Sequence, residues 1–113
     1  MRIVSLHGYP TDPEAFDRYY RDVHTPLVQR IPGVTNIRFG RDVRTEEGGP
    51  APFYLVSDVY FESREAFEAA QASPEMAAAL EDVPRFATGG VTIMICDYAD
   101  FPPIANPPSP KAE

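Results

Sequence analysis

The stretch Phe53–Glu62 constrains the fold more than any other segment, because it has the pattern of a β-strand that is apolar on both faces. Side chains alternate across a strand, so every second residue points the same way. One face carries Phe53, Leu55, Ser57, Val59 and Phe61, and the other carries Tyr54, Val56, Asp58, Tyr60 and Glu62. An antiparallel sheet covered by helices on one side commonly leaves its other side wet. We therefore expect helices on one face of this strand and a second subunit on the other.

The remaining segments supply three more strands, with helices between them. Strands are predicted for Arg2–His7, Val34–Arg44 and Val91–Cys96, and helices for residues 13–31, 64–71 and 76–83. This β-α-β-β-α-β order is the ferredoxin-like pattern and predicts an α+β fold with a four-stranded antiparallel sheet and its helices on one face. The domain is predicted to span residues 1–100. Residues 101–113 hold five prolines, which exclude a helix or central strand, so we expect a tail that is either disordered or laid over a neighbour.

The first helix is predicted to break near its C-terminal end. Pro26 lacks the N–H that would bond the carbonyl of Asp22, and its ring crowds the preceding turn, so we expect a kink around His24–Thr25. Spacings of three and four residues define the apolar face of the helix. This face comprises Phe16, Tyr20, Val23, Leu27 and Ile31. His24 falls at the boundary of this face, on the side of the sheet.

Composition narrows the possible partners and the compartment. A length of 113 residues suits one domain, and the formal net charge of −7 predicts an acidic surface that repels nucleic acid and anionic membranes. Cys96 is the single cysteine, so it cannot form an internal disulfide, and no Cys/His cluster indicates a metal site. The first residues do not resemble a secretion signal, and no apolar stretch is long enough for a membrane span. We expect a cytoplasmic protein.

Two histidines and a tyrosine are the main candidates for chemistry, because the sequence lacks nucleotide-binding, phosphate-binding, zinc-protease and nucleophile-elbow motifs. No cofactor is predicted. His24, beside the expected break, can act as a general base in a cavity, or it can be a partly buried residue bonded to the backbone. Tyr20 lies one turn before His24 and is either its neighbour in the site or a core residue. His7 ends the first strand, at the rim of the same cavity or in solvent.

Four segments of the chain resemble the EthD family. They are residues 16–27 (FDRYYRDVHTPL), 31–34 (IPGV), 54–63 (YLVSDVYFES) and 86–92 (FATGGVT). The resemblance covers about residues 2–98 and implies a dimeric α/β barrel in which two sheets pack face to face. It also implies a link to bacterial ether degradation, where the founding member accompanies a cytochrome monooxygenase system. His24 matches the motif histidine of the family, whose wider superfamily uses a His or Tyr in the helix–sheet pocket for proton transfer.

The predicted site has His24 and Tyr20 as catalytic residues. Its predicted ligand-binding residues are His7, Ser57, Phe16, Leu27, Phe39 and Phe86. The first hypothesis is a cofactor-independent enzyme in which His24 exchanges a proton with a small hydrophobic carbonyl or carboxylate compound of aromatic, polyketide or ether origin. The second is a non-catalytic accessory or ligand-binding protein of an oxygenase pathway. In both cases the expected partners are a small hydrophobic molecule and a second copy of this chain, paired through the sheet face.

Overall fold

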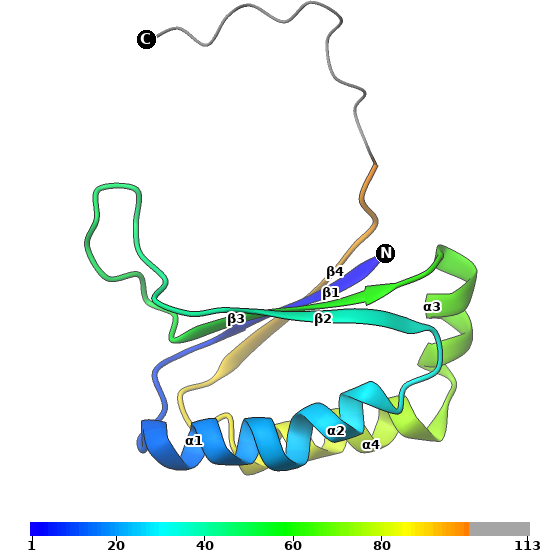
Figure 1. Cartoon of the computed structure of the whole chain (residues 1–113), viewed down its shortest axis with the longest axis horizontal. Helices are drawn as coiled ribbons and strands as arrows, with labels where there is room; N and C mark the ends of the chain where they lie inside the picture. Colours follow the sequence, from blue (N-terminus) through cyan, green and yellow to red (C-terminus); the bar gives the residue numbers. More distant parts are fainter. Residues whose placement is uncertain (100–113) are drawn as a thin grey trace, which may run out of the picture.

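A sheet forms one layer of the structure and helices cover one side of it (Figure 1), in a computed structural model that describes residues 1–99. The strands are β1 (Arg2–His7), β2 (Val34–Gly40), β3 (Leu55–Phe61) and β4 (Val91–Cys96). They lie in the order β2-β3-β1-β4, and each neighbouring pair is antiparallel. The helical elements are α1 (Pro13–Tyr19), η1 (Tyr20–His24), α2 (Thr25–Gln29), α3 (Arg64–Gln71), α4 (Pro74–Asp82) and η2 (Val83–Arg85). The predicted α+β class and ferredoxin-like order are confirmed, and the predicted tail, 101–113, lies outside the described residues.

The central strand β3 is buried on its helix side and half-buried on the other. Its odd-numbered residues from Leu55 to Phe61 are all buried, whereas the even-numbered residues between them are only partly covered. Ser5 and Ile3 of β1 lie opposite Ser57 and Val59, so they share the helix side. The helix cover predicted for one face of this strand is therefore confirmed.

Two groups of buried side chains hold the helices on the sheet, and the space between them becomes the site. One group joins α2, α3 and α4 to β3, and it comprises Val28, Ile31, Val59, Phe61, Phe67, Ala70, Met76 and Ala79. The other joins the start of the first helix to the start of β3 and to the segment before β4, and it comprises Phe16, Tyr20, Leu55 and Phe86. Burial of such side chains supplies the main driving force for folding.

The predicted helix break is present as a turn of π-helix, Tyr20–His24. The N–H of Thr25 bonds the carbonyl of Tyr20, five residues back, and the Thr25 hydroxyl bonds the same carbonyl at 2.7 Å. A π turn holds one residue more than an α turn, so the residues after it face a different way. His24 is consequently buried, whereas Val23 is 41% exposed. The placement of Val23 on the buried face was wrong for this reason.

The loop between β2 and β3 begins earlier and ends later than the alternation predicted. β2 ends at Gly40 rather than Arg44, and β3 begins at Leu55 rather than Phe53. Asp42 adopts a left-handed backbone conformation with φ of 57°, which turns the chain out of the strand. The intervening residues project beyond the sheet as a long hairpin (Figure 1), closed by an isolated bridge between Arg44 and Pro50.

Candidate active site

A small apolar cavity lies between the sheet and the helices, beside the edge strand β4. Its polar lining residues are Ser5, His7, Tyr20, His24 and Ser57. The rest of its lining is Ile3, Val28, Ile31, Val59, Met76, Ala79, Leu80, Val83, Val91 and Ile93. Leu80 of α4 and Ile93 of β4 are 49% and 41% exposed, which places the opening between these two elements. The volume of about 50 Å³ corresponds to space for one or two water molecules.

His24 is held in this cavity by a buried carboxylate. Nδ1 of His24 lies 3.0 Å from Oδ2 of Asp82, and both side chains are more than nine-tenths buried. A carboxylate can only accept a hydrogen bond, so Nδ1 carries the proton and Nε2 keeps a free lone pair. Nε2 is therefore the nitrogen left for a ligand. Burial lowers the pKa of His24, and the bond to Asp82 partly opposes this shift, so the neutral imidazole is favoured at neutral pH.

Asp82 is held in turn by two residues on its outer side. The hydroxyl of Tyr19 donates to Oδ1 of Asp82 at 2.5 Å, and Nη1 of Arg85 lies 3.9 Å from the same oxygen. The sequence analysis did not select Asp82. A usable signal was present, because Asp82 continues the three-residue spacing of the buried residues Met76 and Ala79 along α4.

His7 is buried among aromatic rings and lacks one expected hydrogen-bond partner. It is 2% exposed, and its ring contacts the rings of Phe16, Tyr20 and Phe86 at centroid distances of 5.4 to 5.7 Å. Nδ1 of His7 is buried without a hydrogen bond. Burial, helped by the neighbouring His24, lowers the pKa of His7 to about 4, so the ring is neutral at pH 7. An unpaired buried polar atom is costly, and one that borders a cavity is available to a ligand.

His7 depends on a close approach of two loops at its end of the sheet. The N–H of Gly8 bonds the carbonyl of Gly90 at 2.9 Å. A Cβ atom on Gly8 would collide with the carbonyl of Gly89, and a Cβ on Gly89 would collide with the backbone of Tyr9. Glycine at both positions is therefore needed to place His7 where it is.

Tyr20 completes the polar end of the cavity. Its ring lies 5.6 Å from the ring of His7 and 5.3 Å from that of His24. Burial raises the pKa of the Tyr20 hydroxyl, and a hydrogen bond with Ser57 partly offsets the shift. The hydroxyl is therefore protonated at neutral pH and can donate a hydrogen bond to a ligand oxygen.

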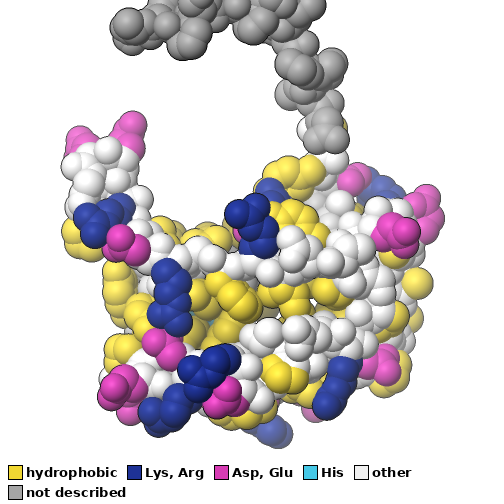
Figure 2. Space-filling view, in the orientation of Figure 1, with side chains coloured by type: hydrophobic (Ala, Val, Ile, Leu, Met, Phe, Trp, Pro, Cys, Tyr) yellow, Lys and Arg dark blue, Asp and Glu magenta, His cyan; other side chains and the backbone are white. Residues whose placement is uncertain are grey.

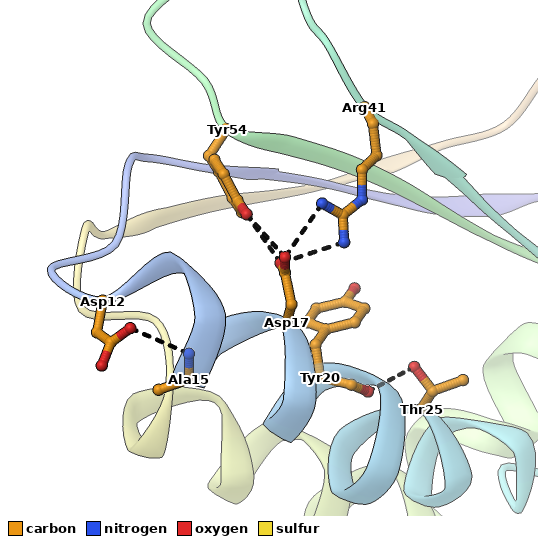
Figure 3. Close-up of polar contacts among 7 residues, drawn as sticks. All are labelled: Asp12, Ala15, Asp17, Tyr20, Thr25, Arg41 and Tyr54. Atoms are coloured by element: carbon orange, nitrogen blue, oxygen red, sulfur yellow. Dashed lines mark hydrogen bonds and ion pairs between the residues drawn. The ribbon is translucent and has the colours of Figure 1, made fainter.

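A second hollow lies on the other side of Tyr20, next to β2. Its volume is about 310 Å³, and Phe39 and Arg41 form part of its rim. Figure 3 shows Asp17 between Tyr54 and Arg41: the Tyr54 hydroxyl donates to Asp17 at 2.9 Å, and Nη2 of Arg41 lies 3.1 Å away. On the face of the molecule shown in Figure 2, hydrophobic side chains follow the boundary between the sheet and the helices, and charged side chains lie beside them. The ring of Tyr20 separates this hollow from the histidines.

The structure brings most of the predicted site residues together. His24, Tyr20, His7 and Ser57 all line the cavity. Phe16 and Phe86 lie behind the histidines, and the ring of Phe86 is 4.6 Å from that of His24. Phe16 and Phe86 do not line the cavity themselves, and the two other predicted ligand-binding residues lie farther from it: Phe39 lines the second hollow, and Leu27 borders a surface hollow by α4. Leu27 does not line the cavity, because the π turn places Val28 on the buried face of α2 instead.

A further hollow of about 450 Å³ is lined by residues of the hairpin between β2 and β3 and contains neither histidine, so nothing connects it with the candidate chemistry. Within residues 1–99, no cluster of three or more His, Cys, Asp or Glu side chains could hold a metal ion. None of the helices in the same range is long and apolar enough to cross a membrane.

Comparison with known proteins identifies the family. The EthD domain model matches residues 8–90. The chain belongs to the EthD family. It is 41% identical over 96 residues to an uncharacterized 11.0 kDa protein of the thcB–thcC intergenic region of Rhodococcus erythropolis, over 85% of this chain and 92% of the relative. An EthD family protein from Bacillus halodurans is 31% identical with a TM-score of 0.77, over 87% of this chain and 97% of that one.

Two more distant structures share the fold with this EthD-family chain. One is a dimeric ferredoxin-like protein of unknown function from Thermobifida fusca, 19% identical with a TM-score of 0.57, over 82% of this chain and 85% of that one. The other is SnoaB, a cofactor-independent oxygenase from Streptomyces nogalater, 13% identical with a TM-score of 0.52, over 87% and 92% of the two chains. At these identities the likeness establishes the ferredoxin-like fold of the dimeric α/β-barrel proteins, and no shared reaction.

Proposed function

We propose that this protein is a cofactor-independent enzyme in which His24 transfers a proton to or from a small hydrophobic compound bound in the cavity. The observation that carries the proposal is the 3.0 Å contact between Nδ1 of His24 and Asp82, on a buried ring that faces an apolar cavity. A histidine oriented by a carboxylate on one nitrogen and open to a ligand on the other is the arrangement of a general acid–base.

The chemistry that fits these groups is proton transfer at a carbon next to an oxygen function. Nε2 of His24 takes the proton, and Asp82 stabilises the imidazolium that forms. The hydroxyl of Tyr20, or His7, donates a hydrogen bond to the oxygen on which negative charge develops. Returning the proton to another atom of the substrate restores the neutral imidazole. Acid–base assistance of this kind accelerates reactions by roughly 10²- to 10⁴-fold.

The test is the exchange of carbon-bound protons in D₂O, followed by proton NMR on aryl ketones, 1,3-diketones and arylacetic acids. We expect the wild-type chain to accelerate exchange for part of this panel and the variant His24→Gln to lose the acceleration. Leu27→Ala is the matched control, because Leu27 belongs to the same helical segment but lies outside the cavity. Equal exchange rates for wild type and His24→Gln, on a compound that the protein does turn over, would exclude His24 as the catalyst.

A ligand-binding accessory protein of an oxygenase pathway is the second candidate. The unpaired Nδ1 of His7 supports it, since a ligand that bonded this atom would be stabilised whether or not a reaction followed. For comparison, SnoaB, which shares the fold, is described as a cofactor-independent oxygenase, and this supports the first candidate, an enzyme without a cofactor. Saturable binding of a compound that is recovered unchanged, across the whole exchange panel, would favour the accessory role.

We also propose that two copies pair through the outer face of the sheet. Val4 lies opposite Met94 and Leu6 lies opposite Val56, so apolar side chains from three strands gather on that face. Met94 is 40% exposed in the single chain. Light scattering should give a dimer mass for the wild type and a monomer mass for Met94→Glu. Val23→Glu, a similarly exposed position on the helix side, should remain dimeric. The predicted cytoplasmic location stays a prediction.

A further inference from the structure

The walls of the cavity carry no positive charge. Its lining within residues 1–99 includes no arginine or lysine, and its two histidines are both neutral at pH 7. The charged group in direct contact with the lining is the carboxylate of Asp82, behind His24. Arg85 lies on the far side of that carboxylate, with its own side chain 70% exposed.

An anionic ligand is disfavoured in such a place for two reasons. Moving a carboxylate from water into an apolar cavity is costly unless a cation or several donors compensate it. The negative charge of Asp82 behind His24 adds repulsion over a short path with little water between the two groups. A neutral carbonyl or hydroxyl has a much smaller desolvation cost and no net charge for Asp82 to repel, and it can bond to His7, His24, Tyr20 or Ser57.

The arginines of the second hollow do not supply the missing charge. Arg41 is engaged with Asp17, and Arg21 is paired with Asp22 at 2.8 Å. The ring of Tyr20 stands between that hollow and His24, since it lines both spaces.

The exposure of the lining side chains distinguishes a closed inner end of the cavity from an open end. His7 and Ser57 are each 2% exposed and lie at its inner end, whereas Leu80 and Ile93 form its apolar mouth. The side chain of His7, whose Nδ1 is buried without a hydrogen bond, forms part of this lining. The enclosed volume of about 50 Å³ admits only the polar end of an organic ligand, so the rest of such a ligand lies between the apolar side chains of the mouth.

We propose that the substrate is an uncharged molecule, a ketone, enol or phenol, that enters between α4 and β4 with its oxygen function leading and its apolar part left at the mouth. This inference rests on the proposed function, because it specifies the compound that His24 acts on. It narrows the carbonyl or carboxylate class to its neutral members.

Three ligands of nearly equal shape test the charge requirement: acetophenone, benzamide and benzoate. The full chain is titrated with each one at pH 7, and the ring protons of His7 and His24 are followed by NMR. We expect acetophenone to bind at least tenfold more tightly than benzoate, with benzamide closer to acetophenone because it is polar but uncharged. Benzoate binding as tightly as acetophenone would overturn the proposal, and so would the absence of binding by all three.

A charge placed at the mouth tests the direction. Leu80→Lys adds a cation beside the opening, and Leu80→Gln is the neutral control of similar length. Both variants remove an apolar contact at the mouth and should weaken acetophenone binding alike, but the ratio of benzoate to acetophenone affinity should be at least threefold higher for Leu80→Lys than for Leu80→Gln. No difference between the two variants would refute the α4–β4 opening. Neutral ligands that bind in this pattern without proton exchange would sustain the inference and refute the catalytic role of His24.

Discussion

Replacing Asp82 by asparagine separates the charge behind His24 from the shape of the side chain. The amide oxygen can still accept from Nδ1 of His24 at the position of the carboxylate, 3.0 Å away, and the hydroxyl of Tyr19 keeps a partner. What is lost is the negative charge that stabilises an imidazolium. The variant therefore leaves the ground state of the neutral ring nearly intact and raises the energy of the protonated intermediate.

The size of the effect follows from the kind of bond that is weakened. A hydrogen bond to a charged group contributes about 1.5–3 kcal/mol. Each 1.36 kcal/mol added to the activation barrier slows a reaction tenfold. The neutral hydrogen bond that asparagine keeps contributes about 0.5–1.5 kcal/mol, so the loss is about 1–1.5 kcal/mol, and Asp82→Asn should lower the rate of proton exchange about 5- to 13-fold. It should also lower the pKa of His24 further, because the bond to Asp82 opposes the effect of burial in the wild type.

The assay measures exchange in D₂O across the acidic range and follows the His24 ring by NMR in parallel. A general base works when it is unprotonated, so the rate rises with pH through the pKa of His24, and the midpoint of the variant should lie at lower pH. Asp17→Asn is the matched control, because Asp17 is bonded by Arg41 and Tyr54 outside the cavity. An Asp82→Asn enzyme with the wild-type rate and an unmoved midpoint would refute the role given to the carboxylate.

Three further predictions concern the groups around His24. His7→Phe should raise the free energy of unfolding by about 1 kcal/mol in denaturant titrations, because it removes an unpaired buried nitrogen, while it weakens ligand binding. The pKa of His7 is lowered to about 4 from its ordinary value of 6.5, so the free energy of unfolding should fall by about 3 kcal/mol as pH drops through that window. His24 acts in the same direction, and His7→Phe should flatten the curve. Tyr19→Phe removes the 2.5 Å bond to Asp82 and should slow exchange about twofold to tenfold, with unchanged ligand affinity by NMR titration.

Local patterns in the sequence were sufficient to predict most of the fold. β1 and β4 have the predicted bounds, and the helix ends lie within two residues of the prediction, because alternation and capping side chains act over short range. The ends of β2 and β3 were misplaced because the left-handed backbone of Asp42 depends on the hairpin as a whole. An alternating pattern contains no information about such a residue.

Only the part of the site that depends on local backbone conformation could be predicted from the sequence. Pro26 indicated the helix break and hence the unusual position of His24. Asp82 is 58 residues away from His24 along the chain, so their contact exists only once α4 has packed beside the first helix. Leu27 and Val23 were misplaced by a single residue of helical phase, which depends on whether Pro26 produces a kink or a π turn.

The π turn is the point at which local sequence and site chemistry meet. Pro26 has no N–H to donate to the carbonyl of Asp22, but Asp22 lies on the exposed side of the helix, where water can replace the missing hydrogen bond. On the buried side, both the N–H and the hydroxyl of Thr25 donate to the carbonyl of Tyr20, so this carbonyl is paired. The irregular turn therefore costs little stability and rotates His24 inward onto Asp82. A hydrophobic residue at position 24 would need no carboxylate beside it, so the buried pairing of His24 with Asp82 supports the proposed proton transfer.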